Sequence, residues 1–410
     1  MSVSIFLFGC GVQLQKKEPK DYSNTIINIY TSFNNEQQFY KNYGNLILDH
    51  FPGIEINLMM PSDNSSGATK IDEHQTITPD LMFLYTDEYQ RLSEQSYFMD
   101  LAPYVEKDKL DLDKYADSMI DALSTEMGSL YGLAPRVNIF GIFYNKDLFD
   151  QLHIDYPVSG MDWYELLNIA SRFEGSTIGI ESTFSASSWL MKITSTNKSY
   201  FIDPKSDSIS FQKEEWTTAI QRIIELYQTE TVLSNKDNQF IQGKAALLLE
   251  GSVQFIDELH RNANFSWGFV PEPVNSKKRD ESRSVFFDQV LSIPEKSADK
   301  ELAWQILKML MDEQVADEYN SFPRSVSTLK SHMNQYSGVS LEEFWQQNLD
   351  INPGILPSVL SSSFIGEFYG TLEKELQLAI DGKQSADQTF EKLVNQTQIA
   401  YEKEKLRNKQ

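Results

Sequence analysis

The pattern of apolar and polar positions near the start of the chain predicts a β-α-β unit. Residues 25–30 (Thr-Ile-Ile-Asn-Ile-Tyr) are rich in β-branched side chains, and residues 54–58 alternate apolar and polar positions like a strand. Between these runs a helix is expected to extend through Leu48. A continuous apolar strand over residues 79–84 then leads into a polar loop at residues 86–88. Because ligands of open α/β sheets bind beyond the carboxyl ends of strands, the loops after the first and last of these strands are candidate walls of a site.

Start signals and apolar spacing indicate further elements along the chain. Residues 136–147 are strand-like and then break into a helix. Asp162 followed by Glu165 predicts a capped helix start, as does the pattern at residues 385–388. Ala303, Ile306, Leu307 and Leu310 follow the three-and-four spacing of a helix after Pro294. Strands alternating with helices favour an α/β fold.

Length and charge narrow the class of protein. At 410 residues the chain exceeds the size of one hydrophobic core, so two lobes with separate cores are expected. The formal charge of −23 repels phosphate backbones, which argues against nucleic acid as a partner and favours an uncharged or cationic ligand. The 12% of aromatic residues is too high for a disordered acidic chain.

The single cysteine, Cys10, directly follows a short apolar run that ends in Gly9. It excludes a disulfide within the chain, and no stretch approaches the ~20 apolar residues of a membrane span. Residues 7–10 (Leu-Phe-Gly-Cys) resemble a bacterial lipobox, in which Cys10 would carry the lipid, although no basic residue precedes it. The alternative is a buried free cysteine in an N-terminal strand. The polar stretch at residues 13–20 fits a tether.

Seven motifs in collinear order resemble the family 1 extracellular solute-binding proteins, of which maltose-binding protein is the best-known member. The clearest is Phe-Tyr-Asn-Lys-Asp-Leu-Phe at residues 143–149, followed by Asp-Trp-Tyr-Glu-Leu at 162–166. The other matching segments are Pro79-Asp80 with Phe83, residues 131–133, residues 240–246 with Glu250-Gly251, residues 301–304 and residues 382–385. The resemblance covers about residues 25 to 405.

This resemblance implies a two-lobed, periplasmic-binding-protein-like α/β fold of type II that closes like a hinge on a ligand in a cleft. The family pattern puts chain crossings near residues 138–141, near 285–288 and around 325–331. Lobe one is then expected to hold residues 22–138 and 288–328, and lobe two residues 139–287 and 329–410, with a signal remnant and tether at 1–21.

The resemblance also implies a site for a sugar, which needs aromatic faces for its apolar side and carboxylates or amides for its hydroxyls. The positions that correspond to such a site are Ser32, Phe33, Asn34, Tyr85, Asp87, Asn138, Glu250, Gly251, Phe287, Asp288 and Tyr369. Trp189, beside the serine-rich run at residues 185–188, is a further candidate, and its alternative is core packing. The alternative for Asn34 and Asp87 is a turn or a helix cap, and the alternative for Tyr369 is packing. Trp163 is expected in the core.

The expected role is that of a monomeric lipoprotein of an ABC importer, anchored at the extracellular face of the cytoplasmic membrane. It would deliver a sugar to the transmembrane subunits of a permease, without a cofactor, a metal or catalysis. The five histidines lack metal-ligand spacing, and no nucleophile elbow or phosphate loop occurs in the sequence. Two alternative functions stay open: a glycosidase with paired carboxylates, and an importer protein for a peptide, a polyamine or a metal chelate.

Overall fold

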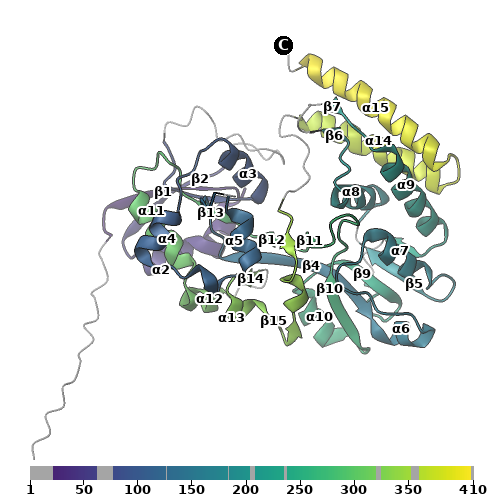
Figure 1. Ribbon diagram of the computed structural model, residues 1–410, viewed down its shortest axis with the longest axis horizontal. Coiled ribbons are helices and arrows are strands. Elements are labelled where there is room, and N and C mark those ends of the chain that lie inside the picture. The colour runs from purple at the N-terminus through teal and green to yellow at the C-terminus, as the bar shows by residue number, and fades with distance from the viewer. Residues whose placement is uncertain are drawn as a thin grey trace, which may run out of the picture.

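The computed structural model describes residues 22–61, 77–125, 127–182, 184–203, 208–234, 238–319, 325–351 and 360–407. The interpretations of Cys10 and of the tether fall outside these residues. Two α/β bodies lie side by side and are joined by the long strand β4 (Arg136–Asn145) and by later segments of the chain (Figure 1). The two-lobed α/β fold predicted from the sequence is thereby confirmed.

The first body is built on a four-stranded sheet in the order β13-β3-β1-β2. Its central strand β1 (Thr25–Thr31) pairs in parallel with β2 (Ile54–Met59) and β3 (Leu81–Leu84), while β13 (Val290–Ser292) pairs antiparallel with β3. The predicted β-α-β unit is confirmed. The helices around this sheet are α1 (Glu36–Phe39), η1 (Tyr40–Gly44), α2 (Asn45–His50), α3 (Thr86–Glu94), α4 (Ala102–Asp108), η2 (Leu112–Lys114), α5 (Asp117–Leu123), α11 (Lys300–Leu310) and α12 (Glu313–Tyr319).

The buried carboxylate of Asp80 connects three segments of the first body. Its Oδ2 accepts hydrogen bonds from the backbone and side-chain nitrogens of Asn28 in β1, at 3.0 and 2.9 Å. Its Oδ1 accepts from the Ser297 hydroxyl at 3.1 Å and from the amides of Ala298 and Asp299 at 3.0 and 3.2 Å, at the start of α11. Because Asp80 is 2% exposed, these donors satisfy a charge that water does not reach.

The second body is built on a sheet in the order β10-β4-β9-β5-β8. Its strands are β5 (Ile178–Ser182), β8 (Val232–Ser234), β9 (Ala245–Ser252) and β10 (Trp267–Pro271), together with the second half of β4. The short hairpin of β6 (Ile202–Asp203) and β7 (Ser208–Ile209) lies apart from this sheet. The helices are α6 (Lys146–Leu152), α7 (Trp163–Ser171), α8 (Ala186–Thr196), α9 (Lys213–Gln228), α10 (Phe255–Asn262), α14 (Ser362–Ile380) and α15 (Ala386–Arg407).

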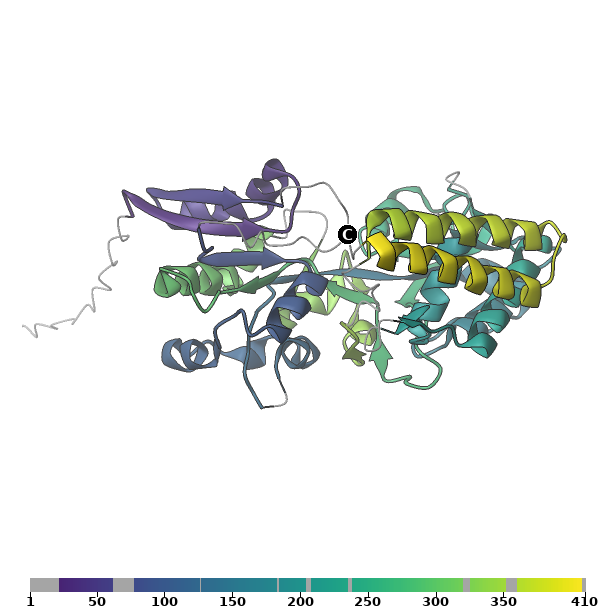
Figure 2. The ribbon, with the colours of Figure 1, turned by 90° about the horizontal axis from the view of Figure 1, so that it is seen from above.

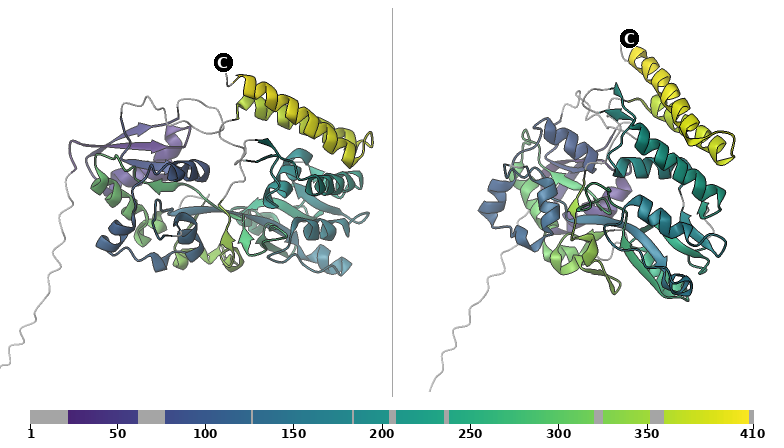
Figure 3. Two further views of the ribbon diagram at one scale, coloured as in Figure 1. Left: turned by 45° about the horizontal axis from the view of Figure 1, so that its top comes forward. Right: turned by 45° about the vertical axis from the view of Figure 1, so that its right-hand side comes forward.

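The predicted helix starts in this body are confirmed by their hydrogen bonds. The Asp162 carboxylate accepts from the Glu165 amide at 2.9 Å, and the Glu165 carboxylate accepts from the Asp162 amide at 2.8 Å. Ser385 and Gln388 form the same reciprocal pair before α15. The long helices α14 and α15 pack side by side as a pair on the outer side of the second body (Figures 2 and 3).

Two later segments run between the bodies. The first contains β11 (Glu281–Ser282) and β12 (Val285–Phe287), and β12 pairs antiparallel with the first half of β4. The second begins with β14 (Val326–Ser327), which also pairs with β4, and continues through α13 (Lys330–Met333), β15 (Gln335–Tyr336), β16 (Val339–Ser340), η3 (Glu342–Phe344) and β17 (Asn348–Leu349). β17 pairs with β11, so the two segments also hold each other.

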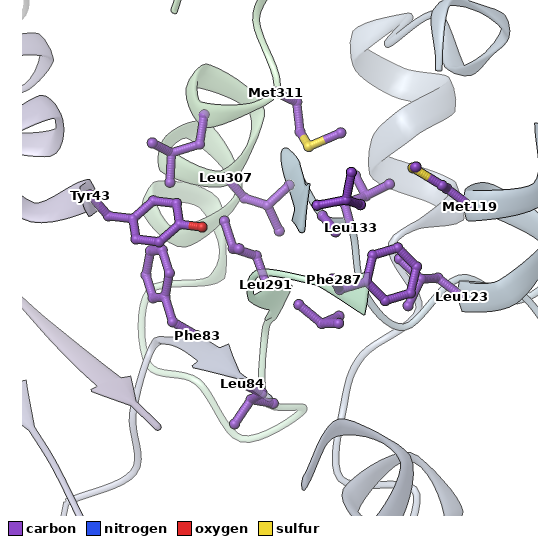
Figure 4. Packing of buried hydrophobic residues seen from close by; sticks show 14 of the residues in the cluster. Tyr43, Phe83, Leu84, Met119, Leu123, Leu133, Phe287, Leu291, Leu307 and Met311 are labelled. Carbon is purple, nitrogen blue, oxygen red and sulfur yellow. The ribbon is translucent and has the colours of Figure 1, made fainter. Parts of the chain in front are cut away.

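Each body contains its own cluster of buried apolar side chains. The first cluster packs the sheet of the first body against α5 and α11, as Leu123, Leu291 and Leu307 show in Figure 4. This cluster extends across β4 as far as Phe143 and Phe269. The second cluster packs α7, α8 and α9 with α14 and α15, and it includes Trp163, which confirms the expected core position. Ala303, Ile306, Leu307 and Leu310 of α11 are all buried, as their spacing predicts.

Among the described residues, no helix combines the length and the apolar character needed to cross a bilayer.

The role of Asp80 predicts a large effect of its removal on stability. Asp80→Ala removes the acceptor shared by the donors of Asn28, Ala298 and Asp299 and leaves a gap at a buried position, so the free energy of unfolding should fall by about 3 kcal/mol or more. The matched control is Asp113→Ala, since Asp113 is exposed, and this change should stay within about 0.5 kcal/mol. Urea denaturation of both variants measures the difference, and equal losses would contradict the assigned role.

Candidate functional site

Aromatic side chains gather at the carboxyl ends of β1 and β3. Phe33 follows β1, and Tyr85 follows β3 as the residue before α3. The ring of Phe33 contacts the ring of Tyr85 edge-on, with 6.1 Å between the ring centres, and it stacks with the ring of Tyr43, with 6.4 Å between the ring centres. Phe33 is 2% exposed and Tyr85 is 44% exposed. Tyr85 is therefore the exposed front of an aromatic wall that Phe33 and Tyr43 support from behind.

A partly buried ion pair lies beside this wall, with the Arg136 side chain 2% exposed and the Asp288 side chain 18% exposed. Oδ2 of Asp288 accepts a hydrogen bond from the Tyr43 hydroxyl at 2.8 Å and one from Nη2 of Arg136 at 2.8 Å. The guanidinium of Arg136 also lies over the Tyr43 ring, 4.4 Å from its centre. Among the described residues, none donates a hydrogen bond to the other carboxylate oxygen, Oδ1. The ion pair thus holds Asp288 in place by one oxygen and leaves the second oxygen as an acceptor.

Negative charge is concentrated around the Tyr85 hydroxyl. Burial raises the pKa of Tyr85, and the carboxylates of Asp288 and Asp87 raise this pKa further, because they disfavour the phenolate. Asp87 is exposed in the first turn of α3. Two carboxylates and a protonated phenol within one small region can accept hydrogen bonds from the hydroxyls or the cationic groups of a ligand.

The strands that join the two bodies present a second aromatic surface. In the antiparallel pairing of β12 with β4, Phe286 lies opposite Asn138, so the two side chains share one face of the sheet. Phe140, two residues further along β4, lies on the same face, and its ring contacts the Phe286 ring edge-on at 6.0 Å. Phe286 is 43% exposed. Arg136 lies two residues before Asn138 on β4, and Asp288 lies two residues after Phe286. Because side chains alternate along a strand, both fall on this same face, so the surface continues toward the ion pair.

The second body contributes the exposed ring of Tyr369 on α14. Tyr369 is 36% exposed, its ring contacts Phe368 edge-on, and partial burial raises its pKa. One helical turn later, the Glu373 carboxylate accepts a hydrogen bond from the Ser187 hydroxyl in the first turn of α8. The hydroxyl of Ser185 caps this helix by accepting from the Ser188 amide. The Ser-rich start of α8 is thereby connected to the helix that carries Tyr369.

Several residues that the sequence placed in the site are buried or already engaged. The Ser32 hydroxyl donates to Glu88, and Trp189 is 1% exposed, with its indole nitrogen donating to Ser182. A Cβ at Gly251 would meet the Phe143 ring at 2.2 Å, so the glycine is needed for packing of β9 against β4. The side chain of Glu250 lies outside the described residues.

The remaining predicted site residues lie at the ends or on the faces described above. Asn34 is exposed and directly precedes Asn35, whose side chain caps α1. Phe287 is 6% exposed and belongs to the first core, where Figure 4 shows it beside Leu123, whereas its neighbour Phe286 faces the other way. The structure brings Tyr85, Asp87 and Asp288 together, with Asn138 on the adjoining strand face.

Sequence reasoning missed Tyr43, Arg136, Phe140 and Phe286. The alternation of side chains along β4 was a usable signal for Phe140, because Asn138 and Phe140 are two residues apart. No comparable signal exists for Tyr43, which comes from the π-helical turn η1 between α1 and α2. Among the described residues, no group of histidine, cysteine and acidic side chains is arranged to hold a metal ion.

The electrostatics of the Tyr85 hydroxyl predict the effect of removing a charge. Asp87→Asn removes one of the two carboxylates that raise the pKa of Tyr85, so this pKa should fall toward the ordinary value. The measurement is a pH titration of fluorotyrosine-labelled protein by fluorine NMR, with the Tyr85 signal assigned from Tyr85→Phe. As a control, Asp113→Asn should leave the titration unchanged. An unchanged or higher pKa in Asp87→Asn would contradict the geometry.

Comparison with known proteins agrees with this architecture. A model of the bacterial extracellular solute-binding protein family matches residues 48–325, which is more than half of the chain. No curated protein sequence matches the chain. Among solved structures, a family 1 extracellular solute-binding protein from Alicyclobacillus acidocaldarius matches with a TM-score of 0.65 at 14% identity, over 93% of this chain and 100% of that chain.

Two further structures share the fold. The sugar-binding protein MalE from Xanthomonas citri matches with a TM-score of 0.63 at 15% identity, over 94% of this chain and 100% of that chain. An ABC substrate-binding protein from Listeria monocytogenes, in complex with cycloalternan, matches with a TM-score of 0.56 at 17% identity, over 92% of this chain and 98% of that chain. At such low sequence identities, the similarity to these structures shows a shared fold and nothing further. The match of the family model over residues 48–325 establishes that the chain belongs to the bacterial extracellular solute-binding proteins.

Proposed function

We propose that this solute-binding protein captures a carbohydrate for an ABC importer. The observation that supports this ligand class most directly is the combination of exposed rings and carboxylates around Tyr85. A sugar ring has an apolar face that stacks on aromatic side chains, and hydroxyls around its edge that donate to carboxylates. Tyr85 and Phe286 offer such rings, while Asp87 and Oδ1 of Asp288 offer the acceptors.

The proposed set of ligand contacts follows from exposure. It comprises the predicted residues Asn34, Tyr85, Asp87, Asn138, Asp288 and Tyr369, with Phe140 and Phe286 added from the structure. Ser32, Phe33, Trp189, Gly251 and Phe287 then support the site from behind, since the structure buries them. Glu250 stays a predicted contact.

Hinged closure is part of the proposal. Lobe one would comprise residues 22–138 and 288–328, and lobe two residues 139–287 and 329–410. The pairing of β4 with β9 shifts register between Gly141 and Phe143, close to the proposed boundary. Such an irregularity bends a strand locally, which suits a hinge. Rotation about it would bring Tyr369 on the second lobe toward Tyr85 and Asp87 on the first.

The relatives support the carbohydrate assignment and the importer role. The protein from Listeria monocytogenes is an ABC substrate-binding protein with bound cycloalternan, and that from Xanthomonas citri is a sugar-binding protein. By extension, this chain would bind its sugar outside the cytoplasm as a monomer and deliver it to the transmembrane subunits of a permease. A lipid on Cys10 would hold it at the extracellular face of the cytoplasmic membrane.

A thermal-shift screen tests the ligand class. Mono- and oligosaccharides are compared with peptides, polyamines and metal chelates, because a compound that binds only the native state raises the melting temperature. A sugar is expected to give the largest shift, and calorimetric titration then measures its affinity. A shift with peptides or polyamines alone would contradict the carbohydrate assignment. Release of reducing ends from the bound sugar after long incubation would instead indicate a glycosidase.

Variants of two proposed contacts sharpen this test. Asp87→Ala removes a charged acceptor and should weaken sugar binding by roughly ten- to a hundredfold. Tyr369→Ala should cost at least about 0.5 to 1.5 kcal/mol of binding free energy. Both side chains are partly exposed, so the melting temperature of the ligand-free protein should change little. Full affinity in either variant, or loss of affinity caused by unfolding, would remove that residue from the proposed site.

The anchor has its own test. A precursor that carries a lipid on Cys10 should partition into membranes, because acyl chains insert into the bilayer. Cys10→Ser should release the protein into the medium while leaving its sugar affinity unchanged, and cell fractionation measures both. Equal partitioning of the variant and the wild type would contradict the lipid anchor.

A further inference from the structure

A buried carboxylate, Glu88, is connected to the backbone that carries the exposed ring of the aromatic wall. Glu88 is in the first turn of α3, next to the proposed contact Asp87, and it is 5% exposed. A ligand in front of Tyr85 would therefore not reach it. Burying a carboxylate is costly unless donors surround it, so its position calls for an explanation.

The contacts of Glu88 connect the end of β1 with the start of α3. Its Oε1 accepts from the Tyr30 hydroxyl at 2.9 Å, and its Oε2 accepts from the Ser32 hydroxyl at 2.6 Å. The same Ser32 oxygen accepts a hydrogen bond from the Tyr85 amide at 3.2 Å. A chain of hydrogen bonds thus runs from Glu88 through Ser32 to the backbone of the residue whose ring forms the exposed part of the wall.

The charges that face Glu88 from the packed elements are few. Burial raises the pKa of Glu88, whereas the hydrogen bonds from Ser32 and Tyr30 and the charge of Arg91 lower it, and the neighbouring Asp87 raises it. Nη2 of Arg91 lies 3.9 Å from Oε1 of Glu88.

The carboxylate of Glu88 also determines how the Ser32 hydroxyl is oriented. Ser32 can keep its oxygen oriented toward the Tyr85 amide only if its own hydrogen has an acceptor, and Oε2 of Glu88 supplies that acceptor.

We propose that Glu88 is a positioning residue of the ligand site, which acts through the Ser32 hydroxyl to fix the backbone of Tyr85 and thereby the aromatic wall. This assigns Ser32, expected from the sequence to contact ligand, a supporting role. The inference rests on the proposed carbohydrate binding only for its affinity measurement, because the hydrogen-exchange rate of the Tyr85 amide can be measured without ligand.

Two hydroxyls donate to the same carboxylate, and this offers a matched pair of variants. Ser32→Ala removes the hydrogen bond that continues to Tyr85, and Tyr30→Phe removes the other one, which does not. Both variants delete one buried hydroxyl that donates to Glu88. Glu88→Met keeps roughly the size of the side chain but removes both acceptor oxygens.

The first measurement is hydrogen exchange of the Tyr85 amide in the ligand-free protein. Exchange should become about tenfold faster in Ser32→Ala and in Glu88→Met and stay near the wild-type rate in Tyr30→Phe, because only the former two break the chain to that amide. Equal rates in all three variants, whether raised or unchanged, would overturn the inference.

The second measurement is affinity, with maltotriose as the probe or else the saccharide that raises the melting temperature most in the screen. Ser32→Ala should weaken binding about tenfold, and Tyr30→Phe less than about threefold. In the Glu88→Met background, Ser32→Ala should add little, since both changes break one chain. Additive losses would mean that Ser32 contacts the sugar directly and would overturn the inference. If no saccharide binds the wild type, the proposed function fails, and the exchange measurement alone decides the role of Glu88.

Discussion

Strand β4 forms backbone hydrogen bonds with both segments that run between the bodies and with the sheet of the second body, and these pairings determine how the parts of the site lie relative to one another. Its first residues pair with β12 and β14, and its later residues pair with β9 and β10. One face of its first half must therefore fill the first core, which Val137 and Ile139 do. The opposite face is left to Arg136, Asn138 and Phe140. Because β4 packs on the first core and pairs in the sheet of the second body, it connects the two bodies without a flexible linker, and in the proposed closure their relative motion would be confined to a local bend.

Three carboxylates that accept several hydrogen bonds organise the first body: Asp80 and Glu88 are buried, and Asp288 is partly exposed. Asp80 fixes β1 to the start of α11, Asp288 holds Arg136 and Tyr43, and Glu88 holds Tyr30 and Ser32. Each of these charges is compensated by hydrogen-bond donors, as burial demands. Because these internal contacts fix the backbone, the exposed groups in front of them, Tyr85 and Asp87, are held in defined positions before a ligand arrives. Such preorganisation lowers the entropic cost of binding.

The two lobes make different kinds of contribution to the proposed site. The first lobe presents rings and acids on the loops that follow parallel strands, which is the usual place for ligands in open α/β sheets. The second presents Tyr369 from the middle of a long helix, supported by the contact of Glu373 with the start of α8. A helix packed on the second core moves with its lobe as a rigid unit, so Tyr369 would approach the first lobe only through closure. In the proposed closure, contact of Tyr369 with a ligand would therefore depend on the position of the hinge.

The sequence alone determined the elements and the class of protein. The alternation at residues 54–58, the apolar run at 79–84 and the paired caps at Asp162 and Ser385 depend on local chemistry, and the structure has the corresponding strands and helices. Ordered motifs over most of the chain carried the resemblance to solute-binding proteins, because the conserved geometry of a fold constrains short segments. The importance of Pro79-Asp80 was visible in the sequence, although its reason, the contact with α11, was not.

Only the tertiary structure decided which polar and aromatic side chains face outward together. Phe286 and Phe287 are neighbours in sequence, yet strand pairing with β4 puts Phe287 in the core and leaves Phe286 exposed. In the sequence, Trp189 lies beside a serine-rich run, which made it a candidate ligand contact, but the packing of α8 buries its ring. Ser32 has the chemistry of a ligand contact, but Glu88 on another element takes its hydrogen. Side-chain direction and long-range partners depend on register and packing between distant segments, and local patterns in the sequence do not contain that information.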